Sequence, residues 1–518
     1  MDTTIETDQM IAWLPELIYF RDNFQTNRAL VCDAAGMIVK IVHAAELTDE
    51  KKINLPRRAL LPGLVNAHSH AFQRVLRGRT EYRTFPGAPP PKGQAPGATQ
   101  NEVDSFWTWR EMMYSAAMRL TPDDIYDVSR MALLEMALSG ITAVGEFHYL
   151  HHAPDGSPYD DPNLLAKEVV SAAAAVGVRI ALLRVAYGRS GFQADANPKQ
   201  KRFIERDVQI YLKNLESLAK SVRSPSVSEG TSNKVALPNG RASDAAWIGI
   251  APHSIRAVPL PYLKDVIDYA TEHDLKIHMH VAEQPAEVSA CIEEHGRTPV
   301  ALLQTEGLLS ERFTAVHAIH VTAKAVRSIA QSGALVCACP TTERNLGDGV
   351  VPADQYVNQD VPICLGTDSH AQIDLLEDAR ELEYHLRLQR LERAVLSVGS
   401  PSVSDGNLGQ QIRPKNRASD SAQLLFNCAT INGARSIGAA GGVLEAGRPA
   451  DFFTVHLDDP SIAGASSDDL LPAIVFSLSR TALREVVVGG KPIVSEGQHL
   501  IQEEVVDRFN ELQKRLWG

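Results

Sequence analysis

Eight short apolar runs recur along the middle of the chain, and most are followed by a segment whose apolar residues have helical spacing. Short apolar runs bounded by polar or turn residues are typical of strands buried on both faces. Alternation of such strands with helices predicts a parallel sheet, and eight repeats are the count of a (β/α)8 barrel. The expected barrel strands are residues 64–67, 141–147, 178–185, 247–251, 276–280, 315–317, 334–337 and 363–366.

Two further groups of strand-like runs lie near the two ends of the chain. Residues 28–42 predict two strands around the turn Asp33-Ala-Ala-Gly36, and residues 451–455 and 485–494 predict a strand and a hairpin. We therefore expect an α/β protein in which a TIM-type (β/α)8 barrel, residues 61–433, carries a small β-sandwich domain. Residues 1–60 and 434–518 would form that domain together.

Three segments read as flexible insertions in the barrel. Residues 221–244 and 397–420 are related to each other, because they agree at 13 of 24 positions and are rich in Ser, Pro, Gly and Asn. Residues 87–99 are rich in Pro and Gly. None has the apolar face that a stacking repeat needs, so all three are interpreted as surface loops.

Polar residues of the kinds that bind metals or transfer protons lie at or just past several strand ends. His68 and His70 are two positions apart in an extended segment, so their side chains point the same way and can share one ion. His280, His317 and Asp368 end three later runs. Barrel enzymes build their sites at this end of the strands, and three imidazoles with one carboxylate suffice for a catalytic zinc.

Composition and charge exclude some classes of protein. The net charge of −12 and the absence of Lys or Arg runs argue against a nucleic-acid or anionic-membrane partner. The chain starts without a basic segment leading into an apolar core, so a cytoplasmic location is the default expectation. The six cysteines are scattered, which favours reduced, buried thiols. A carboxylate-bearing metabolite would need local arginines for its capture.

Six motifs of the chain together resemble those of a known family. The motifs are His68-Ser-His70-Ala-Phe-Gln-Arg, Phe106-Trp-Thr-Trp-Arg110-Glu, Gly145-Glu-Phe-His-Tyr149, Ala251-Pro-His253-Ser-Ile-Arg256, His280-Val-Ala-Glu283-Gln and Gly366-Thr-Asp368-Ser. They resemble the amidohydrolase superfamily and, within it, the formimidoylglutamate deiminases. The resemblance extends from about residue 60 to residue 455, apart from the insertions.

This resemblance implies a reaction and a set of residues for it. The reaction is the hydrolytic deamination of N-formimino-L-glutamate to N-formyl-L-glutamate and ammonia in histidine degradation, carried out by a homodimer with one zinc ion per subunit. His68, His70, His280 and Asp368 would hold the zinc. Glu283 would move protons with help from Asp368, and His317 would orient or stabilise the tetrahedral intermediate. Arg110 and Arg256 would bind the two substrate carboxylates, with hydrogen bonds from Gln73, Tyr149 and His253.

Several alternatives stay open on the sequence alone. His278 shares a strand face with His280, His320 could replace His317, and Glu283 could be an ordinary helix-start carboxylate. Ligand type does not distinguish zinc from iron or manganese. Another aminohydrolase of the superfamily, acting on a purine or related ring, is the nearer functional alternative, and a metal-free scaffold is the more distant one. The nucleobase deaminases of the other fold are disfavoured, because their H-x-E and P-C-x-x-C signature is absent.

Overall fold

A parallel barrel forms the larger part of the molecule. The computed structural model describes residues 9–81, 106–194, 196–223, 245–397 and 417–518. Eight strands there form one sheet in the order β13-β12-β11-β10-β9-β8-β7-β6, so each strand pairs with the next along the chain. They are β6 (Leu64–Ser69), β7 (Ile141–His148), β8 (Arg179–Ala186), β9 (Ala246–Pro252), β10 (Ile277–Val281), β11 (Phe313–His317), β12 (Leu335–Ala338) and β13 (Ile363–Leu365). A bridge between Ser69 and Asp368 joins the two ends of the sheet and nearly closes it. This confirms the predicted (β/α)8 barrel.

Helices cover the outside of the barrel. Strands of a parallel barrel are buried on both faces, and every residue of β6, β7 and β8 is indeed buried. The helices are α1 (Phe106–Ala117), α2 (Pro122–Leu138), α3 (Leu164–Val176), α4 (Val208–Arg223), α5 (Leu260–Glu272), α6 (Pro285–His295), α7 (Pro299–Thr305), α8 (Ala323–Ser332), α9 (Pro340–Leu346), α10 (Ala353–Val357), α11 (Leu375–Arg390), α12 (Arg417–Ala429), α13 (Ile431–Ile437), α14 (Leu470–Ser477) and α15 (Gln502–Trp517). None of these described helices is long and apolar enough to cross a membrane.

The two ends of the chain share a second sheet, as the sequence predicts. Its strands are β1 (Ile11–Phe20), β2 (Asn23–Thr26), β3 (Arg28–Cys32), β4 (Ile38–His43), β5 (Lys51–Pro62), β14 (Phe452–His456), β15 (Leu483–Val488), β16 (Lys491–Ser495) and β17 (Gln498–His499). All nine belong to one hydrogen-bonded sheet that is mostly antiparallel, with β1 and β5 parallel. The pair between β5 and β14 brings the two ends together, with Leu61 opposite Phe453.

The sequence pattern did not reveal β1, β2 and β5. Proline is usually confined to edge strands or bulges, so Pro15 and Pro56 hid the strand character of β1 and β5. The structure accommodates Pro15 at an irregularity, because the register between the two strands shifts between Pro15 and Leu17. On the other strand Arg57 adopts a positive φ of 59°. Both prolines therefore lie where the ladder is interrupted.

The expected insertions fall largely beyond the described residues. Residues 87–99 lie outside them altogether, as do most of residues 221–244 and 397–420. At two margins the expectation of a loop was wrong, because residues 221–223 end α4 and residues 417–420 begin α12. The flanking helices therefore extend into segments whose composition is typical of loops.

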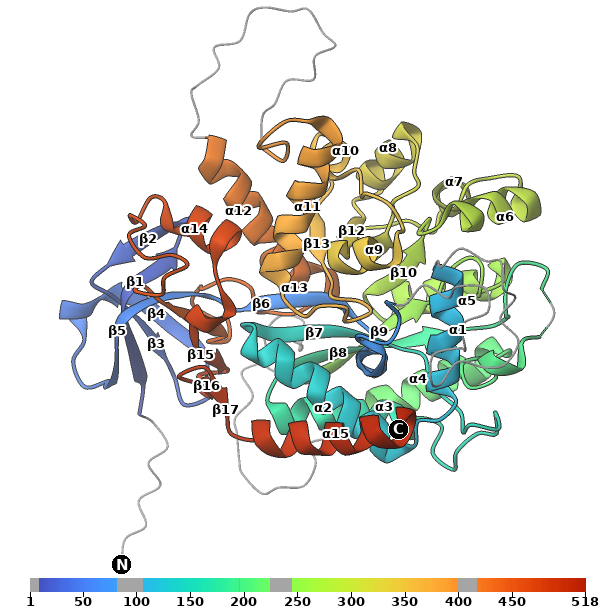
Figure 1. Cartoon of the computed structure of the whole chain (residues 1–518), viewed down its shortest axis with the longest axis horizontal. Helices are drawn as coiled ribbons and strands as arrows, with labels where there is room; N and C mark the ends of the chain where they lie inside the picture. Colours follow the sequence, from blue (N-terminus) through green and yellow to red (C-terminus); the bar gives the residue numbers. More distant parts are fainter. Residues whose placement is uncertain (1–8, 82–105, 195, 224–244, 398–416) are drawn as a thin grey trace, which may run out of the picture.

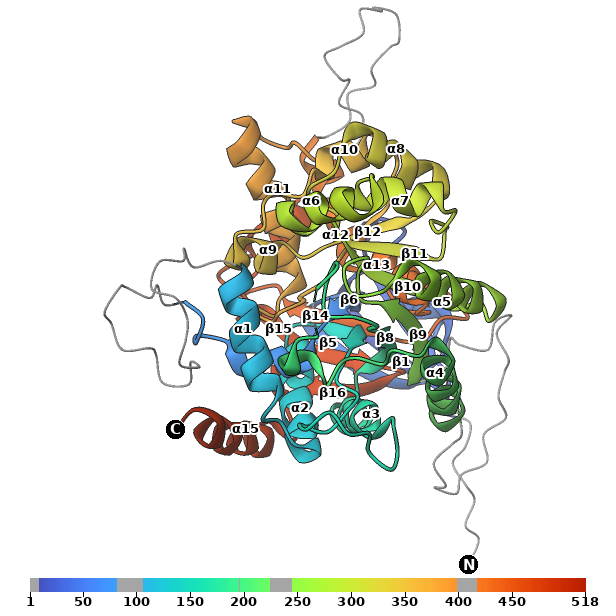
Figure 2. The ribbon, with the colours of Figure 1, turned by 90° about the vertical axis from the view of Figure 1, so that its right-hand side faces the viewer.

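The small sheet and the candidate site lie on opposite sides of the barrel. Figure 1 shows the small sheet at the left and α1 at the right, with α15 running beside α2 below the barrel. Figure 2 faces the side that carries α1. The carboxyl ends of the barrel strands open toward this side, where the strand-end residues gather.

Candidate metal centre and active site

Four side chains from three strand ends converge inside the barrel mouth. His68 is the second-last residue of β6 and His70 lies just beyond that strand, His280 lies in β10, and Asp368 follows β13. Nε2 of His68 is 3.2 Å from Nε2 of His70 and 3.2 Å from Nε2 of His280. Oδ1 of Asp368 is 3.4 Å from Nε2 of His68 and 3.1 Å from Nε2 of His70. The structure thus brings together all four predicted ligands.

These distances fit a shared metal ion. Nitrogen and oxygen ligands that are 2.0–2.1 Å from a tetrahedral ion lie roughly 3.3 Å from each other. Nδ1 of His70 donates to the carbonyl oxygen of Phe147 at 2.9 Å, and Nδ1 of His280 donates to that of His253 at 3.0 Å. Each Nε2 therefore presents a lone pair to the centre, and a cation placed between them relieves their mutual repulsion. Burial also lowers the pKa of His68 to about 3, so its imidazole is neutral, as a metal ligand must be.

Glu283 and His317 lie beside this cluster. Nε2 of His317 is 3.6 Å from Oε1 of Glu283 and 3.8 Å from Oδ2 of Asp368, while its Nδ1 donates to Oε1 of Glu343 at 3.2 Å. Burial opposes the charge on His317, but the carboxylates of Glu283, Glu343 and Asp368 outweigh it and raise its pKa to about 10. Burial raises the pKa of Glu283, which suits a group that must both accept and return a proton.

The backbone at these strand ends is strained. Ala282, His317 and Asp368 have φ values of 52°, 67° and 45°, in the left-handed region that residues with a Cβ avoid. Such conformations cost about 1–3 kcal/mol each and persist where the surrounding structure holds them. Here they turn the chain sharply at the strand end, so that the side chains of His317 and Asp368 point into the mouth of the barrel.

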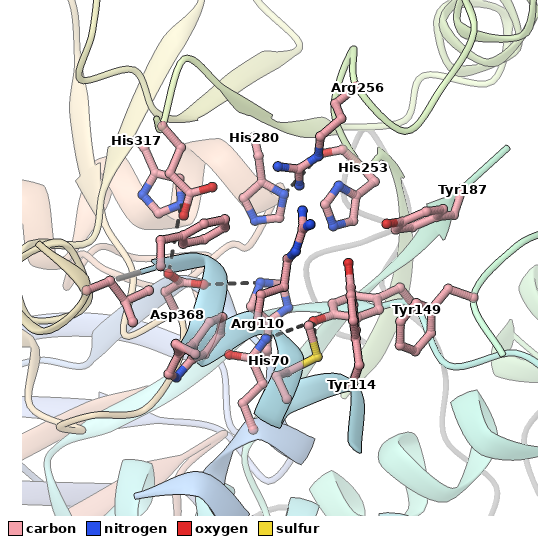
Figure 3. Close-up of a pocket in the computed structure, with 17 residues that line it drawn as sticks. His70, Arg110, Tyr114, Tyr149, Tyr187, His253, Arg256, His280, His317 and Asp368 are labelled. Atoms are coloured by element: carbon pink, nitrogen blue, oxygen red, sulfur yellow. Dashed lines mark hydrogen bonds and ion pairs between the residues drawn. The ribbon is translucent and has the colours of Figure 1, made fainter. Parts of the chain in front are cut away.

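A pocket extends from the cluster toward α1, and two arginines line it. Figure 3 shows Arg110, from α1, and Arg256, from the loop after β9, pointing toward the same region of the pocket. The guanidinium carbons of Arg110 and Arg256 lie 4.5 and 5.9 Å from the centre of the Trp107 ring. Across the described ranges neither guanidinium has an acidic side chain within ion-pair distance, and the Nε atoms of both are buried without a hydrogen-bond acceptor. Two guanidinium groups that share a pocket and have no ion-pair partner among the described residues favour the binding of an anion.

The other predicted substrate-binding residues line the same pocket. Nε2 of Gln73 donates to the hydroxyl of Tyr149 at 2.8 Å. The ring of His253 lies 5.6 Å from that of Tyr149 and 4.9 Å from that of His280, measured between ring centres. The five predicted substrate-binding side chains therefore line one pocket beside the metal cluster, and their contacts with a substrate stay a prediction. They are Gln73, Arg110, Tyr149, His253 and Arg256.

The structure also separates the ambiguous histidines. His278 is 3.1 Å from the carbonyl oxygen of Ser436 through Nε2 and takes no part in the cluster. His320 donates from Nε2 to the carbonyl oxygen of Asp348 at 2.8 Å, whereas His317 faces Glu283 and Asp368. The choice of His280 over His278 and of His317 over His320 is consistent with this geometry.

Sequence reasoning missed several residues that support the site. Glu343 holds His317 and also accepts from the backbone N–H of Cys339 at 2.9 Å. Glu146 accepts from the Ser69 hydroxyl at 2.5 Å and from the backbone N–H of Ala71 at 2.7 Å, and burial raises its pKa to about 7. Tyr187 directly follows β8. The rule that strand ends carry the chemistry could have found Glu146 and Tyr187, which lie at or next to the ends of β7 and β8.

A (β/α)8 barrel with a cluster of three histidines and one aspartate beside a buried Glu283–His317 pair is typical of the metal-dependent hydrolases. The chain belongs to the amidohydrolase family, whose sequence model matches residues 59–493. The protein is a hydrolase of the deaminase group within that family.

Curated and solved relatives cover nearly the whole chain. It is 34% identical over 502 residues to the formimidoylglutamate deiminase of Pseudomonas aeruginosa, covering 96% of this chain and 98% of the relative. It is 25% identical to a 5-methylthioadenosine/S-adenosylhomocysteine deaminase of Pyrococcus abyssi, over 96% of both chains. The crystal structure of an amidohydrolase from Brucella melitensis superposes with a TM-score of 0.80 at 29% identity, over 98% of this chain and all of the other.

Proposed function

We propose that this protein hydrolyses N-formimino-L-glutamate to N-formyl-L-glutamate and ammonia, a step of histidine degradation. The observation that carries the proposal is the pair of guanidinium groups of Arg110 and Arg256, which share one pocket without an acidic partner among the described residues. A substrate with two carboxylates supplies the two negative charges that this pair requires. Its formimino group would then extend toward the metal cluster.

The four clustered ligands would hold one zinc ion. Such an ion would act as a Lewis acid and would make water a nucleophile near neutral pH. Zinc is our choice among the metals that such ligands accept, because imidazole and carboxylate groups are the ligands that zinc commonly has in catalytic sites.

Glu283 is the proposed proton carrier. Attack of water on the formimino carbon forms a C–O bond, and collapse of the tetrahedral intermediate breaks the bond to the terminal nitrogen. Glu283 takes the two protons of the water in turn and delivers both to that nitrogen, the first as the C–O bond forms and the second from the hydroxyl of the intermediate, so ammonia leaves and the carbon becomes a formyl carbonyl. His317, charged and held by Glu343, lies near enough to stabilise negative charge on the oxygen.

One observation favours a second candidate, deamination of a purine-like ring. The pocket is also lined by the aromatic side chains of Phe106, Trp109 and Tyr149, against which a ring could stack. The relative from Pyrococcus abyssi is named for such a reaction. A neutral ring, however, leaves both guanidinium groups of the pocket uncompensated, so we place it second.

The test is ammonia release by the zinc-loaded protein. N-formimino-L-glutamate is compared with 5-methylthioadenosine, guanine and adenosine, and each assay is repeated with Glu283→Gln. We expect turnover of the formimino compound alone and its loss in the variant. Turnover of a ring compound instead of N-formimino-L-glutamate would overturn the proposed substrate. A metal-loaded protein that is inactive on all four compounds would support the alternative of a non-catalytic scaffold.

A further inference from the structure

Two tyrosine hydroxyls lie beside the paired arginines. Tyr114 belongs to α1, one turn after Arg110, and Tyr187 follows β8. Both side chains are buried, and both line the pocket that contains Arg110 and Arg256. In Figure 3 the hydroxyls of Tyr114 and Tyr187 point toward the side of the pocket where the two guanidinium groups lie.

A buried amide fixes the direction of the hydrogen bonds to these phenols. Nε2 of Gln200 donates to the hydroxyl oxygen of Tyr114 at 2.8 Å and to that of Tyr187 at 2.7 Å. The same Nε2 lies 3.3 Å from the carbonyl oxygen of Ser190, which can only accept, so the nitrogen and not the oxygen of the amide faces the phenols. The amide nitrogen is a donor and not an acceptor, so neither phenol can donate to it, and each phenol keeps its own hydrogen to donate elsewhere.

Few acceptors are available to the hydroxyl hydrogens of Tyr114 and Tyr187. The two hydroxyls lie close enough to interact, so one phenol can donate to the other, which leaves at least one O–H for a ligand. Burial and the neighbouring Tyr114 raise the pKa of Tyr187, so this phenol stays neutral and keeps its hydrogen. In the described part of the chain, neither hydroxyl donates to a carboxylate or to a backbone carbonyl oxygen. The pocket thus combines two cations with a phenol donor.

We propose that Tyr114 and Tyr187, oriented by Gln200, form with Arg110 and Arg256 one cradle that binds the two carboxylates of the substrate. The inference rests on the proposed function for the identity of the substrate, and it adds three residues that determine specificity for acids. A carboxylate accepts up to four hydrogen bonds, so guanidinium and phenol donors can serve it together. A neutral ring would leave the phenol hydrogen, as well as the two cations, without an acceptor.

The experiment measures both binding and turnover. Binding of N-formyl-L-glutamate to the zinc-loaded protein is measured by calorimetry for Tyr114→Phe, Tyr187→Phe and the double variant. Loss of a hydrogen bond to a charged group costs about 1.5–3 kcal/mol, so we expect Kd to rise roughly 10- to 100-fold in the double variant. KM for N-formimino-L-glutamate should rise in parallel while kcat changes little, because the phenols lie away from the metal cluster.

A matched control and a cycle of variants separate this role from a structural one. Tyr211→Phe removes a phenol that lies outside the pocket and donates to the carbonyl oxygen of Arg184 at 2.7 Å, so it should leave Kd and KM unchanged. Gln200→Met should raise Kd in the native background and add nothing in the double Phe background, because Gln200 acts only through the two phenols.

The outcomes distinguish this inference from the proposed function. The cradle proposal would be overturned if Kd and KM were unchanged in the double variant, or if Tyr211→Phe raised them by the same factor. Either result would count against it even if N-formimino-L-glutamate is turned over. If the native protein does not turn that compound over but binds N-formyl-L-glutamate in a manner that depends on the phenols, the proposed reaction fails and the cradle stands. Failure of the native protein to bind either acid overturns both.

Discussion

Asp368 contacts His68 through both its backbone and its side chain. Its backbone N–H donates to the carbonyl oxygen of His68 at 3.0 Å, and its Oδ1 is 3.4 Å from Nε2 of the same histidine. The backbone N–H of His70 in turn donates to the carbonyl oxygen of Asp368 at 3.0 Å. These contacts join the first and last strands of the barrel, so the seam that closes the fold runs through three of the four proposed metal ligands.

Metal binding should therefore stabilise the whole barrel. A ligand that binds only the folded state at a thousand times its Kd adds about 4 kcal/mol to the free energy of unfolding. We expect zinc removal by a chelator to lower the thermal midpoint and zinc addition to restore it. Asp368→Ala should abolish this response, whereas His278→Gln, outside the cluster, should keep it. If zinc did not change the thermal midpoint of the native protein, the result would argue against the proposed metal site.

Glu283→Gln separates proton transfer from metal binding. General acid and base groups contribute about 100- to 10,000-fold to rate, so we expect kcat to fall by that amount. The variant retains the size and shape of the side chain, and Glu283 is not among the clustered ligands. Metal content, measured by elemental analysis, should therefore equal that of the native protein. Loss of zinc together with activity would instead make Glu283 a ligand.

The metal cluster could be predicted from the sequence because its members obey local rules. His68 and His70 are two positions apart at the end of β6, and His280 and Asp368 lie at or just past the ends of later strands in a fold whose strand ends all meet at one mouth. For His317 and His320 the rule gives only a preference, because His317 ends β11 and His320 lies beyond that strand. Only the folded structure shows that Nδ1 of His317 is held by Glu343 and that its Nε2 faces the cluster.

His317 and His320 provide a matched pair for testing that choice. Removing a group that stabilises a developing oxyanion costs about 100- to 1,000-fold in kcat, so His317→Asn should lose activity on that scale. His320→Asn loses only a hydrogen bond to the carbonyl oxygen of Asp348, so kcat should change little. The measurement is steady-state ammonia release at saturating substrate. The reverse order of effects would assign the role to His320.

The fold was predictable where apolar runs are uninterrupted, and it was hidden where they are not. The eight barrel strands carry such runs, whereas β1 contains Pro15 and β5 contains Pro56. The supporting groups of the pocket were hidden for a different reason. Gln200 lies in a short 3-10 helix between β8 and α4, far in sequence from Tyr114, and only the tertiary fold brings them together.

The two pocket arginines should control affinity for the acid. Arg110→Gln and Arg256→Gln each remove one cation that faces no described acidic partner, so we expect KM to rise about 10- to 100-fold with each change. Arg119→Gln is the control, since Arg119 packs on the Trp517 ring at 4.9 Å and does not line the pocket. Steady-state kinetics with N-formimino-L-glutamate provide the measurement. A fall in kcat at unchanged KM would contradict a role in substrate binding.

A buried ion pair next to the barrel should make the fold sensitive to acid. Arg184, at the end of β8, is fully buried and donates to both oxygens of Glu205 at 2.6 and 3.1 Å. Burial raises the pKa of Glu205, but His151 and Arg184 outweigh it and hold that pKa at about 2. Glu205→Gln leaves the guanidinium of Arg184 buried without its counter-charge. We expect a loss of about 3–5 kcal/mol in the free energy of unfolding near pH 7, measured with urea.

The sign of the pH dependence follows from the direction of this shift. The pKa of Glu205 is lower in the folded state than in the unfolded chain, where a glutamate titrates near 4.3. The unfolded state therefore binds more protons between about pH 4.3 and pH 2, so the stability that Glu205 provides is complete above this window and is lost as the pH falls through it. Glu205→Gln should lack this component of acid unfolding. Glu306→Gln, which breaks the surface pair with Lys264 at 2.7 Å, should unfold as the native protein does. Equal acid sensitivity in native protein and Glu205→Gln would show that other groups govern the transition.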